Sequence, residues 1–423
     1  MAKRAVDDRA RYRGDVDQRS TDVPPGEQPY ASAVSINMAE LSVSVREIAA
    51  TWRADRGERQ GRRYLDRFDF DRLRDAGLLL LGVPTEMGGL WQGMKSSVRA
   101  VCEIYRTLAA GDPSVALVSS MHPAVIAFWL ACPDASQPVW EAQRHAVFAS
   151  AAAGEQWGTI TSEPGSGGDI TRSRAVATPI DREPFIPGRS YAVSGDKHFG
   201  SGSGITDWMI TTAVPEGESG PTVFVLDVRS QRWDATTGLT LIAEWDGMGM
   251  AATQSHAMRL EGASSVRLAW EGTLEPITTA ASPFMAVLFT AVIVGVVDEA
   301  IAVAREQVRM RSDQLRSYEQ VEWTRAEQDH WVAVQAYEGG VRAIESGDPA
   351  IATYGSLRAK QSVADLAEST LLRLTRVLGG GTFSSRSPFA HWFEDVRALG
   401  FLRPPWGLAY DNLFTTSLEP HDD

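Results

Sequence analysis

The feature that most constrains the fold is a change in hydrophobic periodicity at two points along the chain. Between Met38 and Leu130 apolar residues recur at every third or fourth position, which is the spacing of amphipathic helices. From about residue 154 to residue 276 this spacing gives way to short alternating runs separated by Gly- and Ser-rich turns, which is typical of β-strands. Beyond Pro283 long helical patterns return. The periodicity predicts a helical part, a β part and a second helical part.

These changes divide the chain into five predicted segments. They are a mobile polar arm at 1–35, an N-terminal α-helical domain at 36–153, a middle β domain at 154–276, a C-terminal helical bundle at 277–414 and a tail at 415–423. The bundle is expected to hold long helices over about 284–311, 319–345 and 350–377. Asp112 before Pro113 predicts a helix start, because Asp caps well and Pro suits the first helical position.

The charge balance narrows the possible partners. The 423-residue chain carries 41 Lys and Arg against 54 Asp and Glu, for a net charge of −13. Nucleic-acid surfaces and anionic membrane faces need basic patches, so neither partner is expected. The two cysteines, Cys102 and Cys132, are too few for a disulfide framework or a cysteine-based zinc site. Both are expected to be buried free thiols in a reducing cytoplasm, and no metal site is expected.

The apolar segments are short. Residues 1–20 mix both charge signs without an apolar stretch, so no secretory signal is expected there. The most hydrophobic run, 284–297, is followed at once by Asp298 and Glu299, and it is shorter than the roughly 20 apolar residues that span a bilayer. We expect this run to be a helix buried in a bundle, and the protein to be cytoplasmic.

The strongest local signal is a loop at 161–169, where the first helical part meets the β part. It has the sequence TSEPGSGGD, and glycines at three positions let backbone N–H groups approach a ligand closely. The hydroxyls of Thr161, Ser162 and Ser166 add further hydrogen-bonding groups. Taken alone, a loop of this composition is more often an ordinary surface loop.

Four motifs in register resemble the acyl-CoA dehydrogenase superfamily. The loop at 161–169 is similar to its TEPxxGSD signature, 195–202 (GDKHFGSG) to its GxK-aromatic stretch and 245–250 (WDGMGM) to a third hallmark. Residues 378–381 (LGGG) resemble its late Gly-Gly turn. The resemblance covers roughly 38–414. It implies an α+β, acyl-CoA dehydrogenase-like fold: an N-terminal helical domain, a middle β-barrel domain and a C-terminal helical bundle.

The resemblance also implies contacts to a flavin ring. Ser162 matches a residue that bonds the pyrimidine edge, and Thr161 and Ser166 stand in the same loop. Phe199 matches an aromatic residue near the isoalloxazine, and Ser201 matches a hydroxyl that approaches flavin N5. These residues are the predicted cofactor-binding set of the β part.

A second set implies contacts to the rest of the cofactor. Arg311 matches an arginine that reaches the pyrophosphate, although the Phe-Gly that follows it in the family is absent here. Gly379, Gly380 and Gly381 match a turn that receives the ADP half of FAD from a neighbouring subunit. The resemblance therefore implies FAD, with FMN possible, and a homo-oligomer that is a dimer or a tetramer.

The sequence departs from the family at the residue that decides the mechanism. A dehydrogenase of this family needs a carboxylate that removes the α-proton of an acyl thioester while hydride leaves the β-carbon. Arg403 stands at that position, and arginine stays protonated in proteins. The family's alternative position falls near Met285, and the run 284–297 holds no carboxylate. Glu394 and Asp395 are close in sequence but match positions that pack away from the flavin.

Superfamily members that lack this carboxylate include monooxygenases, which use reduced flavin and O₂ and need a dry pocket. The segment 197–208 is similar to one in dibenzothiophene-monooxygenase-like enzymes, and His122 matches an active-site histidine of that group. The first hypothesis is therefore an oxygen-dependent monooxygenase with Ser201, His122 and Arg403 as catalytic residues. The alternatives are an acyl-CoA α,β-dehydrogenase that passes hydride to FAD with an unrecognised base, and a non-catalytic binding protein.

The hypotheses imply different partners. The substrate is a small molecule or an acyl thioester, and the redox partner is a flavin reductase or an electron transfer flavoprotein. Val118, Met121, Phe128 and Trp129 either line an apolar substrate pocket or belong to the core.

Overall fold

The computed structural model describes residues 36–131, 137–229, 234–270, 273–402 and 404–418. The predicted arm at 1–35, Cys132 and Arg403 lie outside the described residues. The first helical part contains α1 (Met38–Ala54), α2 (Arg56–Arg59), α3 (Arg67–Asp75), η2 (Leu78–Gly82), η3 (Thr85–Met87), α4 (Met94–Gly111), α5 (Pro113–Leu130) and α6 (Pro138–Ala152).

Two of these helices begin at capping signals that are local in sequence. The Asn37 side chain accepts from the N–H groups of Ala39 and Glu40, and Glu40 accepts from the N–H of Asn37, which makes a capping box for α1. Helix α5 begins where the sequence predicts, because Asp112 accepts from the N–H of Val115 (3.0 Å) and Pro113 occupies the first turn.

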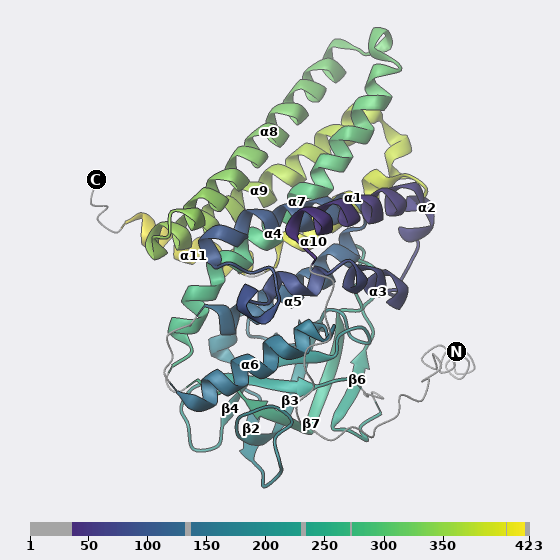
Figure 1. The fold of residues 1–423 in the computed structure, drawn as a ribbon. Coiled ribbons are helices and arrows are strands. Elements are labelled where there is room, and N and C mark those ends of the chain that lie inside the picture. The colour runs from purple at the N-terminus through teal and green to yellow at the C-terminus, as the bar shows by residue number, and fades with distance from the viewer. Residues whose placement is uncertain (1–35, 132–136, 230–233, 271–272, 403, 419–423) are drawn as a thin grey trace, which may run out of the picture. The chain divides into compact units, whose positions relative to one another are not determined.

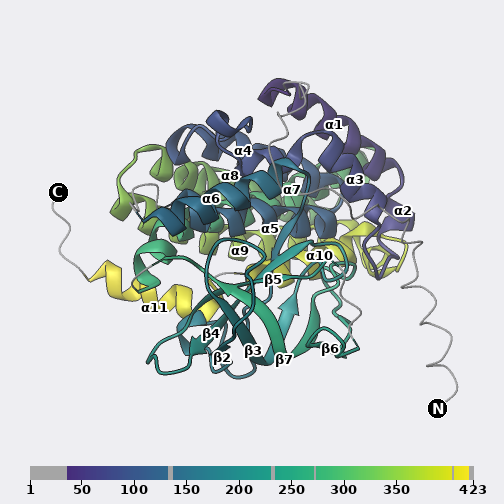
Figure 2. The ribbon, with the colours of Figure 1, turned by 60° about the horizontal axis from the view of Figure 1, so that its bottom comes forward.

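The middle part is a seven-stranded sheet that closes on itself. Its strands are β1 (Trp157–Thr159), β2 (Val176–Pro179), β3 (Ser190–Gly200), β4 (Trp208–Pro215), β5 (Thr222–Asp227), β6 (Leu239–Ala243) and β7 (His256–Arg267), with η4 (Ile170–Arg172) before β2. The pairings β4–β2, β2–β3, β3–β7, β7–β5 and β5–β4 complete a ring. Strand β1 pairs with β4, and β6 pairs with β7, beside which it lies in Figure 2. This is the small barrel that the family resemblance implies.

The second helical part contains three long helices and shorter ones after them. They are α7 (Glu275–Arg309), η5 (Ser312–Gln314), α8 (Ser317–Glu345), α9 (Pro349–Leu378), η6 (Gly380–Phe383), α10 (Pro388–Gly400) and α11 (Trp406–Ser417). Helix α7 begins before the predicted start near residue 284, because Pro283 is accommodated inside the helix. Helix α11 runs into the segment predicted as a tail, and residues 419–423 lie outside the described residues.

The helices of the first part lie between the long helices and the barrel, as Figure 1 shows for α4 and α5. Helix α4 packs on α7, and α5 contacts both α7 and β1. Buried apolar side chains of α1, α4, α5 and α7 make the largest core, and a second core joins α5 and α6 to the outer face of the barrel. The site described below therefore lies against a rigid wall of packed helices.

Two helices, α5 and α7, are long and apolar enough to cross a membrane by length and composition alone. Their most apolar windows are 89% and 83% buried inside the protein, which is typical of core helices. The run 284–297 within α7 is buried, as expected from the sequence. Cys102 is a buried free thiol, also as expected.

Candidate active site

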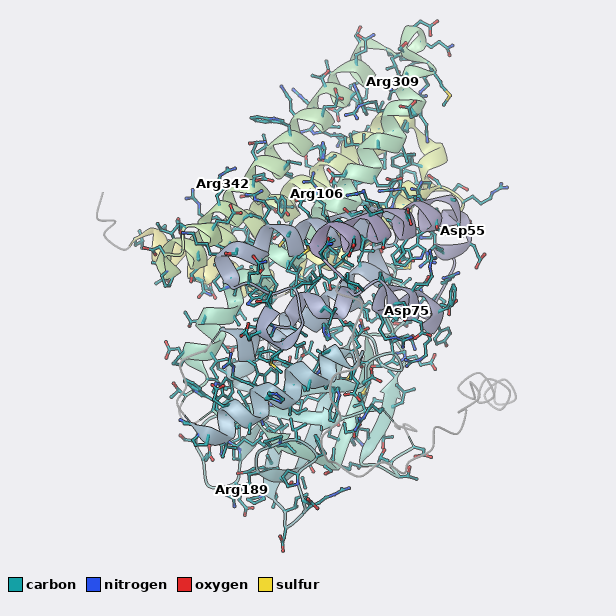
Figure 3. All side chains as sticks on the ribbon, in the orientation of Figure 1. Asp55, Asp75, Arg106, Arg189, Arg309 and Arg342 are labelled. Carbon is teal, nitrogen blue, oxygen red and sulfur yellow. The ribbon has the colours of Figure 1, made fainter. Side chains whose placement is uncertain are left out.

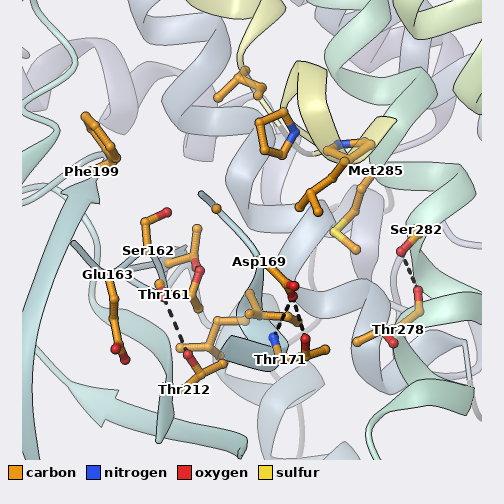
Figure 4. Close-up of a pocket in the computed structure, with 18 of the residues that line it drawn as sticks. Thr161, Ser162, Glu163, Asp169, Thr171, Phe199, Thr212, Thr278, Ser282 and Met285 are labelled. Carbon is orange, nitrogen blue, oxygen red and sulfur yellow. Dashed lines mark hydrogen bonds between the residues drawn. The ribbon is translucent and has the colours of Figure 1, made fainter. Parts of the chain in front are cut away.

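A cavity of about 1910 Å³ lies between the barrel, α5, α7 and the segment that joins α10 to α11. The part of its helical wall that α5 forms is apolar and includes Met121 and Phe128, and Met285 of α7 adds to it. Thr278 and Ser282 of α7 also line the cavity. Val118 and Trp129 are fully buried in the core and do not belong to this lining. The barrel wall is polar, and Figure 4 shows Thr161 and Ser162 across the cavity from Met285. An apolar wall that faces hydroxyl groups suits a flat ligand with one polar edge.

The loop at 161–169 presents its backbone to the cavity. The carbonyl of Ser162 accepts from the N–H of His198 (2.8 Å), which ties the loop to β3. Gly165, Gly167 and Gly168 all have φ between 64° and 82°, and all three line the cavity. A Cβ placed on Gly167 would meet no atom within 4 Å, so the backbone there faces open space. A ligand can therefore approach this loop closely.

Ser166, which was predicted to contact the cofactor, lies outside the described cavity lining. Its side chain is buried, its Oγ donates to the carbonyl of Glu163 (3.0 Å) and accepts from the N–H of Gly168 (3.2 Å). Because both bonds close the turn, Ser166 shapes the loop instead of contacting a ligand.

A buried ion pair between Glu163 and Lys197 holds this loop on the barrel. Lys197 is fully buried, and its Nζ donates to Glu163 Oε1 (2.5 Å) and to the carbonyl of Thr212 (2.5 Å). The carboxylate also accepts from Ser173 Oγ (2.5 Å) and from the N–H of Arg174 (2.7 Å). Burial by itself would raise the pKa of Glu163, but these hydrogen bonds lower it below its usual range. The pair fixes the chain directly after Ser162 and two residues before Phe199.

Phe199 enters the cavity in a strained conformation. Its φ is 60°, a left-handed value that is rare for an aromatic residue, and its side chain is 58% exposed. The Trp245 ring contacts it edge-on at 6.0 Å between centroids. Such strain persists where surrounding structure imposes it, and it is concentrated at binding sites. The exposed ring is available to pack against a planar ligand.

Three hydroxyl groups form a chain beside Phe199. Ser201 Oγ lies 2.9 Å from Ser255 Oγ, and Ser255 Oγ lies 2.8 Å from Thr253 Oγ1. Thr253 Oγ1 donates in turn to the carbonyl of Met250 (2.9 Å). All four residues line the cavity. The predicted residue Ser201 is therefore the terminal member of a hydrogen-bonded chain.

Lys360 of α9 anchors the segment around residues 400–404, which holds the family's base position. The Nζ of this buried side chain donates to the carbonyls of Gly400 (2.5 Å) and Pro404 (3.0 Å), and burial lowers its pKa to about 8. Leu402 and Pro404 line the cavity, while Arg403 itself lies outside the described residues. The prediction that Arg403 is catalytic therefore stays a prediction.

Neither acid of α10 faces the cavity as a base. Asp395 Oδ1 accepts from the N–H of Met250 (2.6 Å), and burial raises its pKa to about 7. Glu394 pairs with Arg397 one turn along the helix. Neither carboxylate belongs to the described lining of the cavity. Asp395 instead holds the WDGMGM loop on α10.

The prediction that His122 lies in the active site is not met. The ring is fully buried outside the described cavity lining, with Nε2 3.0 Å from the carbonyl of Leu79. Its Nδ1 accepts from the N–H of Trp157 (3.0 Å). Burial lowers its pKa to about 4, so the ring is neutral at physiological pH. Both nitrogens join main-chain segments, and His122 therefore connects α5 to the start of the barrel.

Arg311 and the glycine turn lie together, away from the cavity. Arg311 donates to the carbonyl of Val377 (2.5 Å) at the end of α9, and Gly379–Gly381 follow directly. Figure 3 labels Arg309 at this end of the bundle, where α7 turns toward α8. Cβ atoms on Gly379, Gly380 or Gly381 would meet nothing within 4 Å. This second predicted set therefore forms an open tip with a guanidinium beside it.

The cavity and its lining fit a flavin ring. The open backbone at Gly167, the exposed ring of Phe199 and the hydroxyl of Ser201 supply a close approach, a stacking surface and a polar contact on one wall. The apolar helical wall stands opposite. These are the features that a planar heterocycle with one polar edge requires.

Comparison with known proteins agrees with this architecture. No protein-family model matches the chain. The amino sugar nitrososynthase DnmZ of Streptomyces peucetius is 25% identical over 361 residues, which cover 79% of this chain and 82% of that protein. Butyryl-CoA dehydrogenase of Megasphaera elsdenii is similar in structure, with a TM-score of 0.75, 18% identity and coverage of 93% of this chain and 100% of that one. FMN-bound TdsC of Paenibacillus sp. A11-2 has a TM-score of 0.73, 19% identity and coverage of 89% and 97%.

The chain has the acyl-CoA dehydrogenase fold. KijD3, solved in complex with dTDP, shares it with a TM-score of 0.73 at 19% identity, over 92% of this chain and 98% of that one. The predicted α+β arrangement of helical domain, barrel and helical bundle is thereby confirmed.

Within the acyl-CoA dehydrogenase fold, sequence reasoning found Thr161, Ser162, Phe199 and Ser201 at the cavity. It missed the ion pair and the inner members of the hydroxyl chain. Lys197 stands within the strand β3, but its partner Glu163 lies 34 positions away in the sequence. Thr253 and Ser255 lie three and five positions after the WDGMGM motif, yet only folding brings them to Ser201.

Proposed function

We propose that this protein is a flavin-dependent monooxygenase that uses O₂ to oxygenate a small molecule in the cavity. The observation that carries the proposal is the state of the carboxylates that line the described part of the cavity. A dehydrogenase needs one of them poised as a base next to the substrate. A monooxygenase needs instead a dry, polar-edged pocket.

The lining carboxylates are engaged or exposed. Glu163 is neutralised by Lys197, and Glu218 is paired with Arg267. Asp169 accepts from the N–H and the hydroxyl of Thr171 and so caps η4 (Figure 4). Glu275 is exposed in the first turn of α7. This arrangement supports oxygenation over α-proton removal.

The chain's own residues would hold the flavin and keep water out. Bound in reduced form, a flavin supplies the electrons that activate O₂. Ser162 and the glycine loop contact its polar edge, Phe199 packs against the ring, and Ser201 provides a hydrogen bond. Met121, Met285 and the other apolar residues of the helical wall exclude water from the reacting centre.

We further propose FAD as the flavin and a homo-oligomer as the active form. Arg311 and the glycine turn at 379–381 form a tip that is separate from the described cavity lining, so they would serve a cofactor held by a neighbouring copy. A guanidinium suits a pyrophosphate, and open glycines suit the approach of an adenosine group. FMN, the flavin of TdsC, would leave this tip unused.

The substrate that we propose carries a basic amine. Asp169 and Glu275 both line the cavity and have no cationic partner among the described residues, which favours a positively charged ligand. The relative DnmZ is an amino sugar nitrososynthase, and its acceptor is therefore an amine. A separate flavin reductase supplies the electrons in this proposal, and both proteins act in the cytoplasm.

The first experiment follows the reaction of reduced, flavin-loaded protein with O₂ by stopped-flow absorbance, without substrate. A monooxygenase should give a transient absorbance that belongs to neither reduced nor oxidised flavin. Slow reoxidation without a transient would refute the proposal. The alternative, an acyl-thioester dehydrogenase coupled to an electron transfer flavoprotein, predicts anaerobic bleaching of bound FAD by a panel of acyl-CoA compounds. A protein that takes up no flavin would support the non-catalytic alternative.

A further inference from the structure

The three hydroxyl groups at the cavity wall share their protons along one line of hydrogen bonds. Ser201, Ser255 and Thr253 are 6%, 8% and 0% exposed, so their hydrogen bonds are made within the protein or to a ligand. Three hydroxyls carry three protons. They serve four positions: the two links between hydroxyls, the link to the carbonyl of Met250 and the link from Ser201 into the cavity. One position is therefore always without a hydroxyl proton.

Two ordered arrangements follow from this count. When every proton points inward, Thr253 donates to Met250, and Ser201 offers the cavity a lone pair. When every proton points outward, Ser201 donates into the cavity, and the carbonyl of Met250 loses the bond from Thr253 Oγ1. The change is a rotation of three hydroxyls, and no covalent bond forms or breaks.

The outward arrangement costs little free energy because the carbonyl of Met250 has other donors. This carbonyl also accepts from Trp245 Nε1 (3.0 Å) and from the N–H of Thr253 (3.1 Å). A carbonyl oxygen has two lone pairs, so these two donors satisfy it without the hydroxyl. Reversing such a chain usually costs free energy because it leaves a buried polar group unpaired. Here the loss of the third bond leaves no such group, because the carbonyl of Met250 keeps two donors.

We propose that Ser201, Ser255 and Thr253 form a reversible hydroxyl chain that serves a ligand atom alternating between acceptor and donor. The inference rests on the proposed function, in which flavin N5 is that atom: N5 accepts when oxidised and carries a hydrogen when reduced. Ser201 is the contacting residue. Ser255 and Thr253 are positioning residues that take up the proton of Ser201 when the ligand donates.

Thr253→Val tests the chain, because it removes the inner hydroxyl and keeps the side-chain shape. Among the described protein groups, Ser255 can then donate only to Ser201, which favours the arrangement in which Ser201 donates into the cavity. Binding of reduced flavin should weaken by about three- to tenfold, the worth of one hydrogen bond, while oxidised flavin binds within about twofold of wild type. The corresponding midpoint potential falls by about 15–30 mV for a two-electron couple. Ser201→Ala should weaken both oxidation states and leave their ratio near that of wild type.

Thr211→Val is the matched control. Thr211 is fully buried in the same barrel and donates to the carbonyl of Ile160 (2.7 Å), but it is not among the described lining residues. Thr211→Val should keep the wild-type ratio of the dissociation constants for reduced and oxidised flavin. Thr253→Ser keeps a hydroxyl at position 253 and should show the wild-type ratio as well.

The hydroxyl-chain inference would be overturned, and the flavin proposal kept, by either of two results. One is normal flavin binding with an unchanged ratio of dissociation constants in Thr253→Val, and the other is an equal change of that ratio in Thr211→Val. A wild-type protein that binds neither FAD nor FMN would overturn the flavin proposal and this inference with it. If Thr253→Val does not fold, Ser255→Ala gives the same test. It removes the acceptor for the Ser201 proton when the ligand donates, so it should also weaken the binding of reduced flavin selectively. An unchanged ratio in that variant would equally contradict the chain.

Discussion

The ion pair between Glu163 and Lys197 allows the construction of the site to be tested through stability. Lys197→Met removes the charge and keeps most of the volume of a fully buried side chain. The substitution eliminates the bonds from Nζ to Glu163 Oε1 and to the carbonyl of Thr212, each 2.5 Å long. Glu163, itself 8% exposed, becomes a buried carboxylate without a cation.

The expected cost follows from what remains around Glu163. Removing one member of a buried ion pair costs about 3–5 kcal/mol. Glu163 would keep donors from Ser173 Oγ (2.5 Å) and from the N–H groups of Arg174 (2.7 Å) and Ala175 (3.2 Å). Hydrogen bonds to charged groups are worth about 1.5–3 kcal/mol, so the three retained bonds limit the damage. We expect the free energy of unfolding to fall by about 3 kcal/mol at neutral pH.

The effect should depend on pH in a defined direction. In the wild type the pKa of Glu163 is lowered, so the pair stabilises the fold above the ordinary glutamate range, and this stabilisation is lost as the pH falls through the folded value. In Lys197→Met the same carboxyl has a raised pKa, because burial is no longer offset by the cation. The variant should therefore recover part of its deficit below about pH 4.5.

Urea unfolding followed by tryptophan fluorescence measures these differences. The control is the double variant Lys197→Met with Glu163→Gln, which leaves no uncompensated charge and should be more stable than Lys197→Met alone. A loss below about 1 kcal/mol in the single variant, or equal losses in the single and double variants, would refute the reasoning.

Three further outcomes are expected. Because burial raises the pKa of Asp395 to about 7, its contribution to stability is complete below the ordinary aspartate range and is lost as the pH rises from that range through about 7. Asp395→Asn should remove this part of the slope of melting temperature between about pH 4 and pH 7, and an unchanged slope would contradict the assignment. His122→Ala should lower the free energy of unfolding by about 2–4 kcal/mol through two lost hydrogen bonds and a cavity, with an unchanged dissociation constant for flavin at low temperature; weaker flavin binding without loss of stability would restore a role at the site. Arg311→Ala should weaken FAD about tenfold and leave FMN unchanged in fluorescence titrations, whereas equal effects on both flavins would argue against the proposed tip contact.

The order of helices and strands could be predicted because it depends on signals that lie close together in the chain. Asp112 and Pro113 start α5 through a bond to Val115, three residues from the cap. The break before α9 has the same local cause, since Asp348 caps the N–H groups of Ala350 and Ile351. The start of α7 was misplaced because nothing local shows that Pro283 can be accommodated inside a helix.

The residues that face the cavity were predictable only in part, because a motif shows which residue types are present and not which neighbours hold them. Ser162, Phe199 and Ser201 are at the cavity as their motifs predict. His122 and Ser166 have the right chemistry, but the protein's own backbone uses their polar atoms.

By itself, then, the sequence determined where this chain changes from helices to strands and back, and which loop lines the cavity, since hydrophobic periodicity, caps and glycines act over a few residues. The tertiary structure decided how the site works. The bond from Ser201 to Ser255 spans 54 positions, and the bond from Asp395 to Met250 spans 145. A hydrogen bond depends on tenths of an ångström between atoms. The pairing of β3 with β7 brings Ser201 to Ser255, and the packing of α10 on the WDGMGM loop brings Asp395 to Met250.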